Sequence, residues 1–132
     1  MVNEDQYGNQ INNLKEIKMI NIAIHLLGLF TGFIGPLIFY LIATTNETKE
    51  HAKKVLNWQF SFLIYTVINF IITYISFFIY FIGTSKFAII TVIGYLIIIV
   101  LSILNIIFNI KGAIKANNNI LWDYPLSIKF FK

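Results

Sequence analysis

The sequence contains no cysteine and no arginine, and acidic residues are scarce. Its 132 residues include ten lysines and only six aspartates or glutamates. The lack of cysteine excludes disulfide bonds, thiolate metal sites and cysteine-linked lipid anchors. With 58% hydrophobic and 12% charged residues, the composition also excludes an ordinary water-soluble domain.

Charged residues are missing altogether from three long stretches. Residues 19–46, 55–85 and 87–110 carry no Lys, Arg, Asp or Glu over 28, 31 and 24 residues. Each stretch is longer than the roughly 20 residues that a helix needs to cross ~30 Å of hydrocarbon. We therefore predict an all-α integral membrane protein. It would have a kinked or re-entrant first helical element, a two-helix transmembrane hairpin and an interfacial C-terminal tail.

The chain divides into three segments. Residues 1–16 are polar and rich in asparagine, and we expect them to form a flexible tail. Residues 17–116 form the membrane domain, with helices at about 17–44, 47–83 and 86–116. The short link GTSK at residues 83–86 predicts an antiparallel hairpin between the last two helices. Residues 117–132 form a tail rich in aromatic residues and lysine.

Glycines and a proline interrupt the first apolar stretch, HLLGLFTGFIGPLIFYLI at residues 25–42. A break between Gly32 and Pro36 would give two half-helices, each too short to cross, so that the chain returns to the side where it began. Nine lysines then lie on one side and only Lys86 on the other, whereas a single span divides them seven to three. The positive-inside rule favours the first arrangement. A span kinked at Pro36 remains the alternative.

Small and polar residues recur at helical spacing within the apolar stretches. Lipid offers them no hydrogen-bond partner, so we expect them to face other helices. They form either the seam of a compact bundle or the lining of a polar pathway. The absence of carboxylates inside the stretches weighs against an ion relay. The candidate residues are His25, Gln59, Asn69, Asn105 and Asn109.

Two further groups of candidate residues flank the apolar stretches. His51, Asn57 and Gln59 lie where the second helix meets the membrane. One interpretation is that they bind a headgroup or a partner peptide. The other is that His51 extends to the membrane interface while Asn57 and Gln59 bond to the first or third helix. The tail combines aromatic rings with lysines, which is typical of a segment at the headgroup level of an anionic leaflet. Its candidate residues are Trp122, Tyr124, Pro125 and Lys129.

Three segments resemble a known family. The stretches EHAKKVLNWQFS at residues 50–61 and AIKANNNILWDYPLSIKFFK at residues 113–132, together with the glycine-containing first stretch, are similar to motifs of the Tic-twenty-like family. These are small bacterial membrane proteins of unknown function that resemble a component of the chloroplast inner-envelope import machinery. Trp58 and Asn119 depart from the family pattern. The resemblance implies a helical membrane fold and a location in the bacterial cytoplasmic membrane.

The sequence shows no constellation of residues for catalysis, for a metal or for another cofactor. The histidines lack an acidic partner within the apolar stretches, the serines lack a base, and no glycine-rich loop precedes a helix. We therefore expect a non-enzymatic membrane protein that binds or stabilises another membrane component. The alternatives are a transport or translocation element, acting as an oligomer or with a partner, and a protein that protects against membrane-active peptides. The expected partners are the lipid bilayer and a membrane protein or a second copy of the chain, and not nucleic acid.

Overall fold

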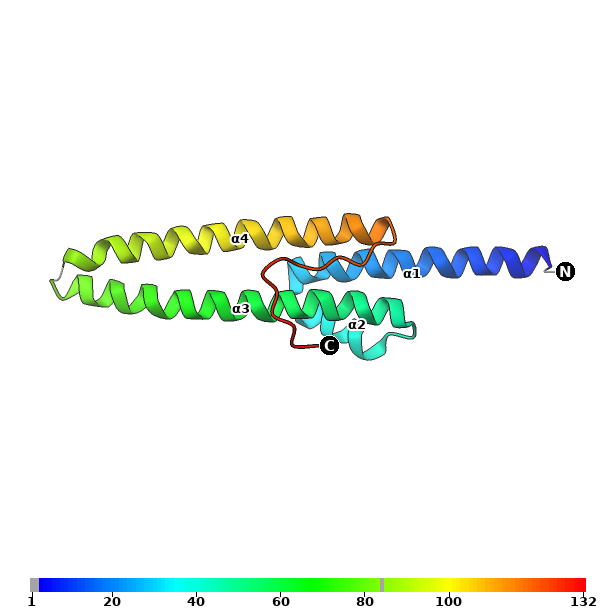
Figure 1. The fold of residues 1–132 in the computed structure, drawn as a ribbon, viewed down its shortest axis with the longest axis horizontal. Helices are drawn as coiled ribbons and strands as arrows, with labels where there is room; N and C mark the ends of the chain where they lie inside the picture. Colours follow the sequence, from blue (N-terminus) through cyan, green and yellow to red (C-terminus); the bar gives the residue numbers. More distant parts are fainter. Residues whose placement is uncertain (1–2, 84) are drawn as a thin grey trace.

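A computed structural model describes residues 3–83 and 85–132, and all regular structure within them is helical (Figure 1). This confirms the predicted all-α class. The described residues form four α-helices and a short 3-10 helix, and residues after 117 wrap back along the helices without regular structure. The elements are α1 (Glu4–Thr31), α2 (Ile34–Ile42), α3 (Asn46–Phe81), η1 (Ser85–Phe87) and α4 (Ala88–Asn117).

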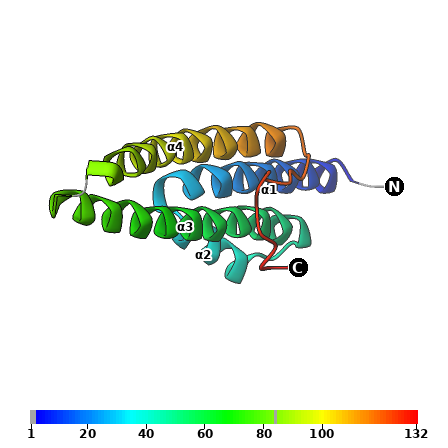
Figure 2. The same ribbon diagram turned by 60° about the vertical axis from the view of Figure 1, so that its left-hand side comes forward.

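The helices α3 and α4 form a long antiparallel hairpin (Figures 1 and 2). With 36 residues, α3 is about 54 Å long at 1.5 Å per residue. Both helices are long and apolar enough to cross a membrane, and in the most apolar 18-residue window of each only 11% is buried inside the protein. So large an apolar surface is compatible with lipid and not with water. The predicted pair of long apolar helices is thus confirmed, while Thr84 of the predicted turn lies outside the described residues.

The first apolar stretch, expected as one kinked or re-entrant element over residues 17–44, forms two helices, with the break at Gly32 and Phe33 at the start of the interruption that the sequence indicated. Gly32, which follows the last residue of α1, has φ +62°, a conformation that residues with a Cβ rarely adopt. The chain reverses there, and α2 runs back beside α3 (Figure 1). Thr31 Oγ1 accepts a hydrogen bond from the backbone N–H of Gly35 at 2.9 Å across the break. Pro36 lies in the first turn of α2, where a backbone N–H has no partner within the helix.

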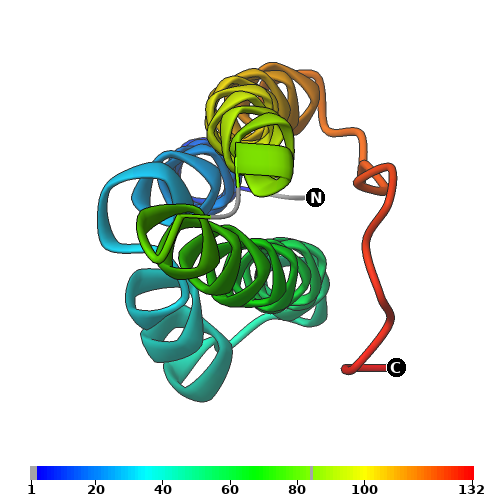
Figure 3. The same ribbon diagram turned by 90° about the vertical axis from the view of Figure 1, so that its left-hand side faces the viewer.

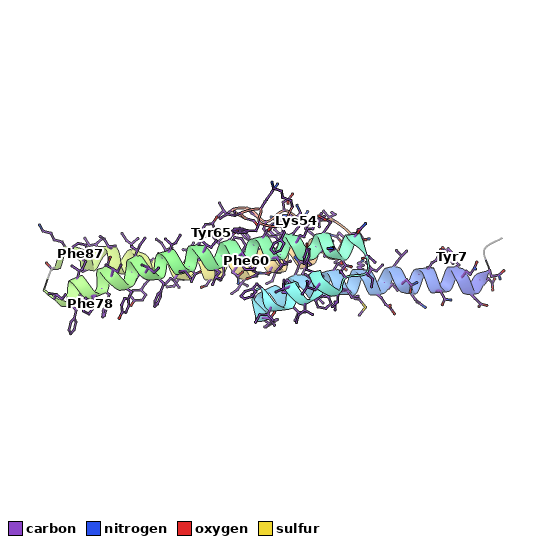
Figure 4. The ribbon with its side chains drawn as sticks, turned by 90° about the horizontal axis from the view of Figure 1, so that it is seen from below. Tyr7, Lys54, Phe60, Tyr65, Phe78 and Phe87 are labelled. Carbon is purple, nitrogen blue, oxygen red and sulfur yellow. The ribbon has the colours of Figure 1, made fainter. Side chains whose placement is uncertain are left out.

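The N-terminal segment differs from the flexible tail that we expected. From Glu4 onward the described residues are helical, and the first turns of α1 extend beyond the other helices (Figure 1). Tyr7 projects from this end, whereas Phe78 and Phe87 lie at the opposite end of the molecule, at the tip of the hairpin (Figure 4). Because helix propagation costs little once a packed segment has nucleated the helix, α1 continues outward without a hydrophobic face. The spacing of hydrophobic residues in the sequence alone gives no signal for such an exposed helix.

The four helices come together only at the end of the α3–α4 hairpin that is away from its tip (Figure 1). We call this region the helical base; it consists of the buried part of α1 from Asn21, α2, the first half of α3, the last half of α4 and the tail. Viewed end-on, α1 and α2 lie on one side of α3 and the tail lies on the other (Figure 3). Beyond the base, the second half of α3 and the first half of α4 continue side by side as a pair of helices. We call this pair the two-helix ribbon. The buried hydrophobic residues of the base are Ile24, Ala52, Val55, Leu56, Trp58, Ala113, Ala116 and Tyr124.

Candidate functional site

The two histidines of the sequence meet a tyrosine inside the helical base. Nε2 of His25 lies 3.0 Å from Nδ1 of His51, and Nδ1 of His25 lies 2.6 Å from Oη of Tyr124. All three side chains are buried. Because they come from α1, α3 and the tail, this hydrogen-bonded chain links three segments that are far apart in the sequence. We call it the His–His–Tyr chain.

The His–His–Tyr chain can exist without any charged group. Burial raises the pKa of the Tyr124 hydroxyl, which therefore stays protonated. The hydroxyl can donate to Nδ1 of His25, and a neutral His25 then carries its hydrogen on Nε2 and donates it to His51. At the edge of this cluster, Nδ2 of Asn21 donates to a carboxylate oxygen of Glu47 at 2.9 Å. No group of three or more histidine, aspartate or glutamate side chains converges as a metal site in the described residues.

Three of the seam candidates form a second polar cluster between α3 and α4. Oδ1 of Asn105 accepts hydrogen bonds from Nε1 of Trp58 and Nδ2 of Asn109, both at 2.9 Å, and from Nε2 of Gln59 at 3.4 Å. Gln59 and Asn109 are buried, and Asn105 is half-buried. Gly28 of α1 packs directly against this cluster, because a Cβ there would lie 2.8 Å from Oδ1 of Asn109. Amides that bond to one another in this way stabilise helix contacts in lipid.

Asn69 lies apart from both clusters, in the two-helix ribbon. Its Nδ2 donates to the backbone oxygen of Gly94 at 3.0 Å, and its side chain is half-buried. Gly94 allows α4 to approach α3 closely here, because a Cβ on Gly94 would collide with Thr73. The five seam candidates therefore fall into three separate groups of contacts: His25 in the first, the three clustered amides in the second and Asn69 in the third.

The C-terminal tail is bound along α3 by side chains that project from one face of that helix. Oδ1 of Asn57 accepts from the backbone N–H groups of Phe130 and Phe131 at 2.9 and 2.8 Å, and its Nδ2 donates to the oxygen of Phe131 at 3.0 Å. One turn further along, Oγ of Ser61 accepts from the backbone N–H of Ile128 at 2.7 Å. The tail is thus held by the protein itself.

Two more α3 side chains complete this attachment. The hydroxyl of Tyr65 donates to the backbone oxygen of Leu126 at 2.7 Å, and Lys54 forms an ion pair with Asp123. Sequence reasoning singled out neither Ser61 nor Tyr65 as a site residue. A signal was present nonetheless, because Asn57, Ser61 and Tyr65 recur every four residues and so share one helix face.

The candidate residues of the tail have different environments. Tyr124 is buried, and its ring stacks on Trp58 with 6.0 Å between ring centroids. Trp122 is half-buried beside Tyr124, while Pro125 and Lys129 are exposed. Of the candidates at the start of α3, Gln59 bonds to α4 as one interpretation expected, whereas Asn57 bonds to the tail.

The sequence can be compared with known protein families. A family model described as the magnetosome magnetite crystal formation protein family matches residues 16–131. The chain belongs to this family. Comparison with curated proteins and with solved structures gave no match.

Membership of the magnetosome magnetite crystal formation family corrects the resemblance drawn from the sequence. The assignment to the Tic-twenty-like family was wrong, because the matching model covers nearly the whole chain. In the structure, residues 50–61 and 113–132, on which the resemblance was based, contain the groups that bind the tail to α3. These motifs report how the base packs, and packing motifs do not identify an activity.

Proposed function

We propose that this member of the magnetosome magnetite crystal formation family is a non-enzymatic membrane protein that acts by binding or stabilising another component of the magnetosome membrane. The observation that carries this proposal is the two-helix ribbon. Beyond the helical base, α3 and α4 expose large apolar side chains on almost every face, among them Phe70 and Tyr74 at 59% and 60% exposure. Such a surface fits lipid and the transmembrane helices of a partner.

The distribution of charge favours an indirect role in crystal formation. Iron bound by oxygen ligands is held mainly by carboxylates, yet residues 82–90 at the hairpin tip contain no aspartate or glutamate. All six acidic residues precede α3 or lie in the helical base and its tail, namely Glu4, Asp5, Glu16, Glu47, Glu50 and Asp123. A tip that faces the growing crystal would therefore offer it no carboxylate, so we infer that the chain acts through its partner.

We also propose that α1 and α2 form a re-entrant element, with both ends of the chain on the cytoplasmic side. The reversal at Gly32 supports this, because the nine residues of α2 extend only about 14 Å and cannot cross the hydrocarbon. This topology places nine lysines on the cytoplasmic side and Lys86 alone on the other, in agreement with the positive-inside rule.

Labelling of single cysteines tests this topology, and the cysteine-free chain provides a clean background. Cysteines introduced at Asn3, Thr44 and Ser85, all exposed, are treated with a membrane-impermeant maleimide in sealed vesicles of known orientation. We expect Asn3→Cys and Thr44→Cys to react from the same side and Ser85→Cys only from the opposite side. Reaction of the first two from opposite sides would mean that α1 and α2 together cross the membrane.

Affinity capture tests the proposed function. The tagged full chain is extracted in mild detergent from magnetosome-forming cells, and we expect a stoichiometric membrane protein to copurify. Substituting Phe70→Ala and Tyr74→Ala in the ribbon should reduce the captured partner at least tenfold and alter crystal size, with the fold intact. The matched control, Phe30→Ala with Leu41→Ala, removes two exposed apolar residues of the base at 81% and 72% exposure and should leave capture unchanged.

A different result would favour the transport hypothesis. If the purified chain has no partner and carries iron or other ions across liposome membranes, the binding role fails. Substitution of His25, Asn69 or Asn105 would then lower flux while the protein remained folded. In a packing role the same substitutions would instead lower the amount of folded protein.

A further inference from the structure

A cavity lined mainly by charged and polar residues lies between the first turns of α3 and the tail. Its volume of about 420 Å³ falls within the roughly 300–1,000 Å³ that is usual for small-ligand sites. Four lysines and two acidic residues line it, so the positive side-chain charges outnumber the negative ones by two. These residues are Lys53, Lys54, Lys129, Lys132, Glu50 and Asp123. The cavity is separate from the His–His–Tyr chain except for Tyr124, which contributes to its wall.

The excess positive charge belongs to the tail. Lys53 pairs with Glu50 at 2.6 Å, and Lys54 pairs with Asp123. Lys129 and Lys132 also line the cavity, and neither forms an ion pair within residues 3–83 and 85–132. Their ammonium groups are therefore available to a bound anion. The half-buried Ser127 adds a hydroxyl group to the same wall.

The cavity lies where polar and apolar surfaces of the molecule meet. Lys54 is the last charged residue of α3 before the charge-free stretch, and it lies on the edge of α3 over which the tail passes (Figure 4). Phe131 lines the cavity and packs on Tyr40 of α2 and Phe60 of α3, with 5.4 and 6.0 Å between ring centroids. In a membrane, lysines at this level lie beside lipid phosphates, and the rings lead towards the acyl chains.

We propose that this cavity binds a phosphate group, and that the headgroup of an anionic phospholipid supplies it. Lysine is a common phosphate ligand because its ammonium group offers a compact positive charge. A free phosphate ion has the same chemistry, but it lacks acyl chains to contact Phe131 and Phe60. The site requires only that the chain lies in a membrane, so it goes beyond the proposed function and does not depend on it.

Lipid binding by the purified full chain tests this site. The chain in a neutral detergent is titrated with short-chain phosphatidylglycerol or phosphatidylcholine, and native mass spectrometry counts the bound lipid. Each lysine beside an anionic lipid strengthens binding about fivefold. We therefore expect Lys129→Gln with Lys132→Gln to weaken phosphatidylglycerol binding about 25-fold. The matched control, Lys15→Gln with Lys86→Gln, removes the same charge far from the cavity and should change binding less than twofold.

Further measurements separate the outcomes. Lys129→Arg with Lys132→Arg should keep the affinity for phosphatidylglycerol, because the site requires positive charge rather than a particular packing. The thermal unfolding temperature measured without lipid should be equal in all variants. Inorganic phosphate that binds at the same lysines and displaces phosphatidylglycerol would support the phosphate site and identify the free ion as a second source. Equal affinity for the two lipids, or equal loss in the tail and control variants, would overturn the proposal.

Discussion

Replacing Gly112 by alanine is expected to destabilise the helical base by about 3 kcal/mol or more, because overpacking and loss of buried hydrogen bonds each cost about 1–3 kcal/mol. A Cβ at this position would lie 2.7 Å from Oη of Tyr124 and would collide with the ring of His25. Neither ring can move away freely. His25 is also bonded to His51, and Tyr124 is stacked on Trp58.

Thermal unfolding in detergent, followed by circular dichroism in the near and far ultraviolet, measures this effect. Gly8→Ala is the matched control, because nothing lies within 4 Å of the position that its Cβ would take. In an exposed helical turn this change should stabilise the helix by up to about 1 kcal/mol. A Gly112→Ala variant as stable as the wild type would show that α4 does not pack against the His–His–Tyr chain as described.

Replacing Asn57 by leucine should release the tail from α3. The variant loses three hydrogen bonds to Phe130 and Phe131, and at about 1 kcal/mol each this corresponds to roughly a 100-fold rise in the detached population. When opening and closing are fast, the rate of proteolysis follows that population. Cleavage by trypsin after Lys129, detected by mass spectrometry, should therefore become about 100-fold faster.

The control for this experiment is Asn69→Leu, which removes an amide from the same helix outside the tail contact. Asn69 bonds to the backbone of Gly94 on α4, so the cleavage rate after Lys129 should stay within about twofold of the wild-type rate. Equal cleavage rates in wild type and Asn57→Leu would indicate that lipid, and not Asn57, holds the tail in place.

The reversal of the first apolar stretch could be predicted in part from the sequence. Glycine and proline act through the local backbone, so a break between Gly32 and Pro36 is visible without any knowledge of packing. The sequence left a kinked span and a re-entrant element open, and the structure has the chain turn back at Gly32. Whether that turn lies within a membrane remains the prediction that cysteine labelling tests.

The sequence also indicated which polar residues belong to helix contacts, but not their partners. Helical spacing singled out Gln59, Asn105 and Asn109, and these three side chains do bond to one another. One of the two interpretations of the residues at the start of α3 had Asn57 bond to another helix, whereas its partner is the tail. Spacing shows which face of a helix a residue occupies, but not which segment packs on that face.

By itself the sequence determined the helical class and the two long apolar helices, because both depend on the length and polarity of continuous stretches. Only the tertiary structure decided that His25 meets His51 and Tyr124, which are 26 and 99 residues away in the chain. It also decided that α1 continues as an exposed helix to Glu4, since helix propagation depends on a packed segment further along. Contacts over such distances depend on how the helices and the tail pack together, and no local pattern of residues encodes that packing.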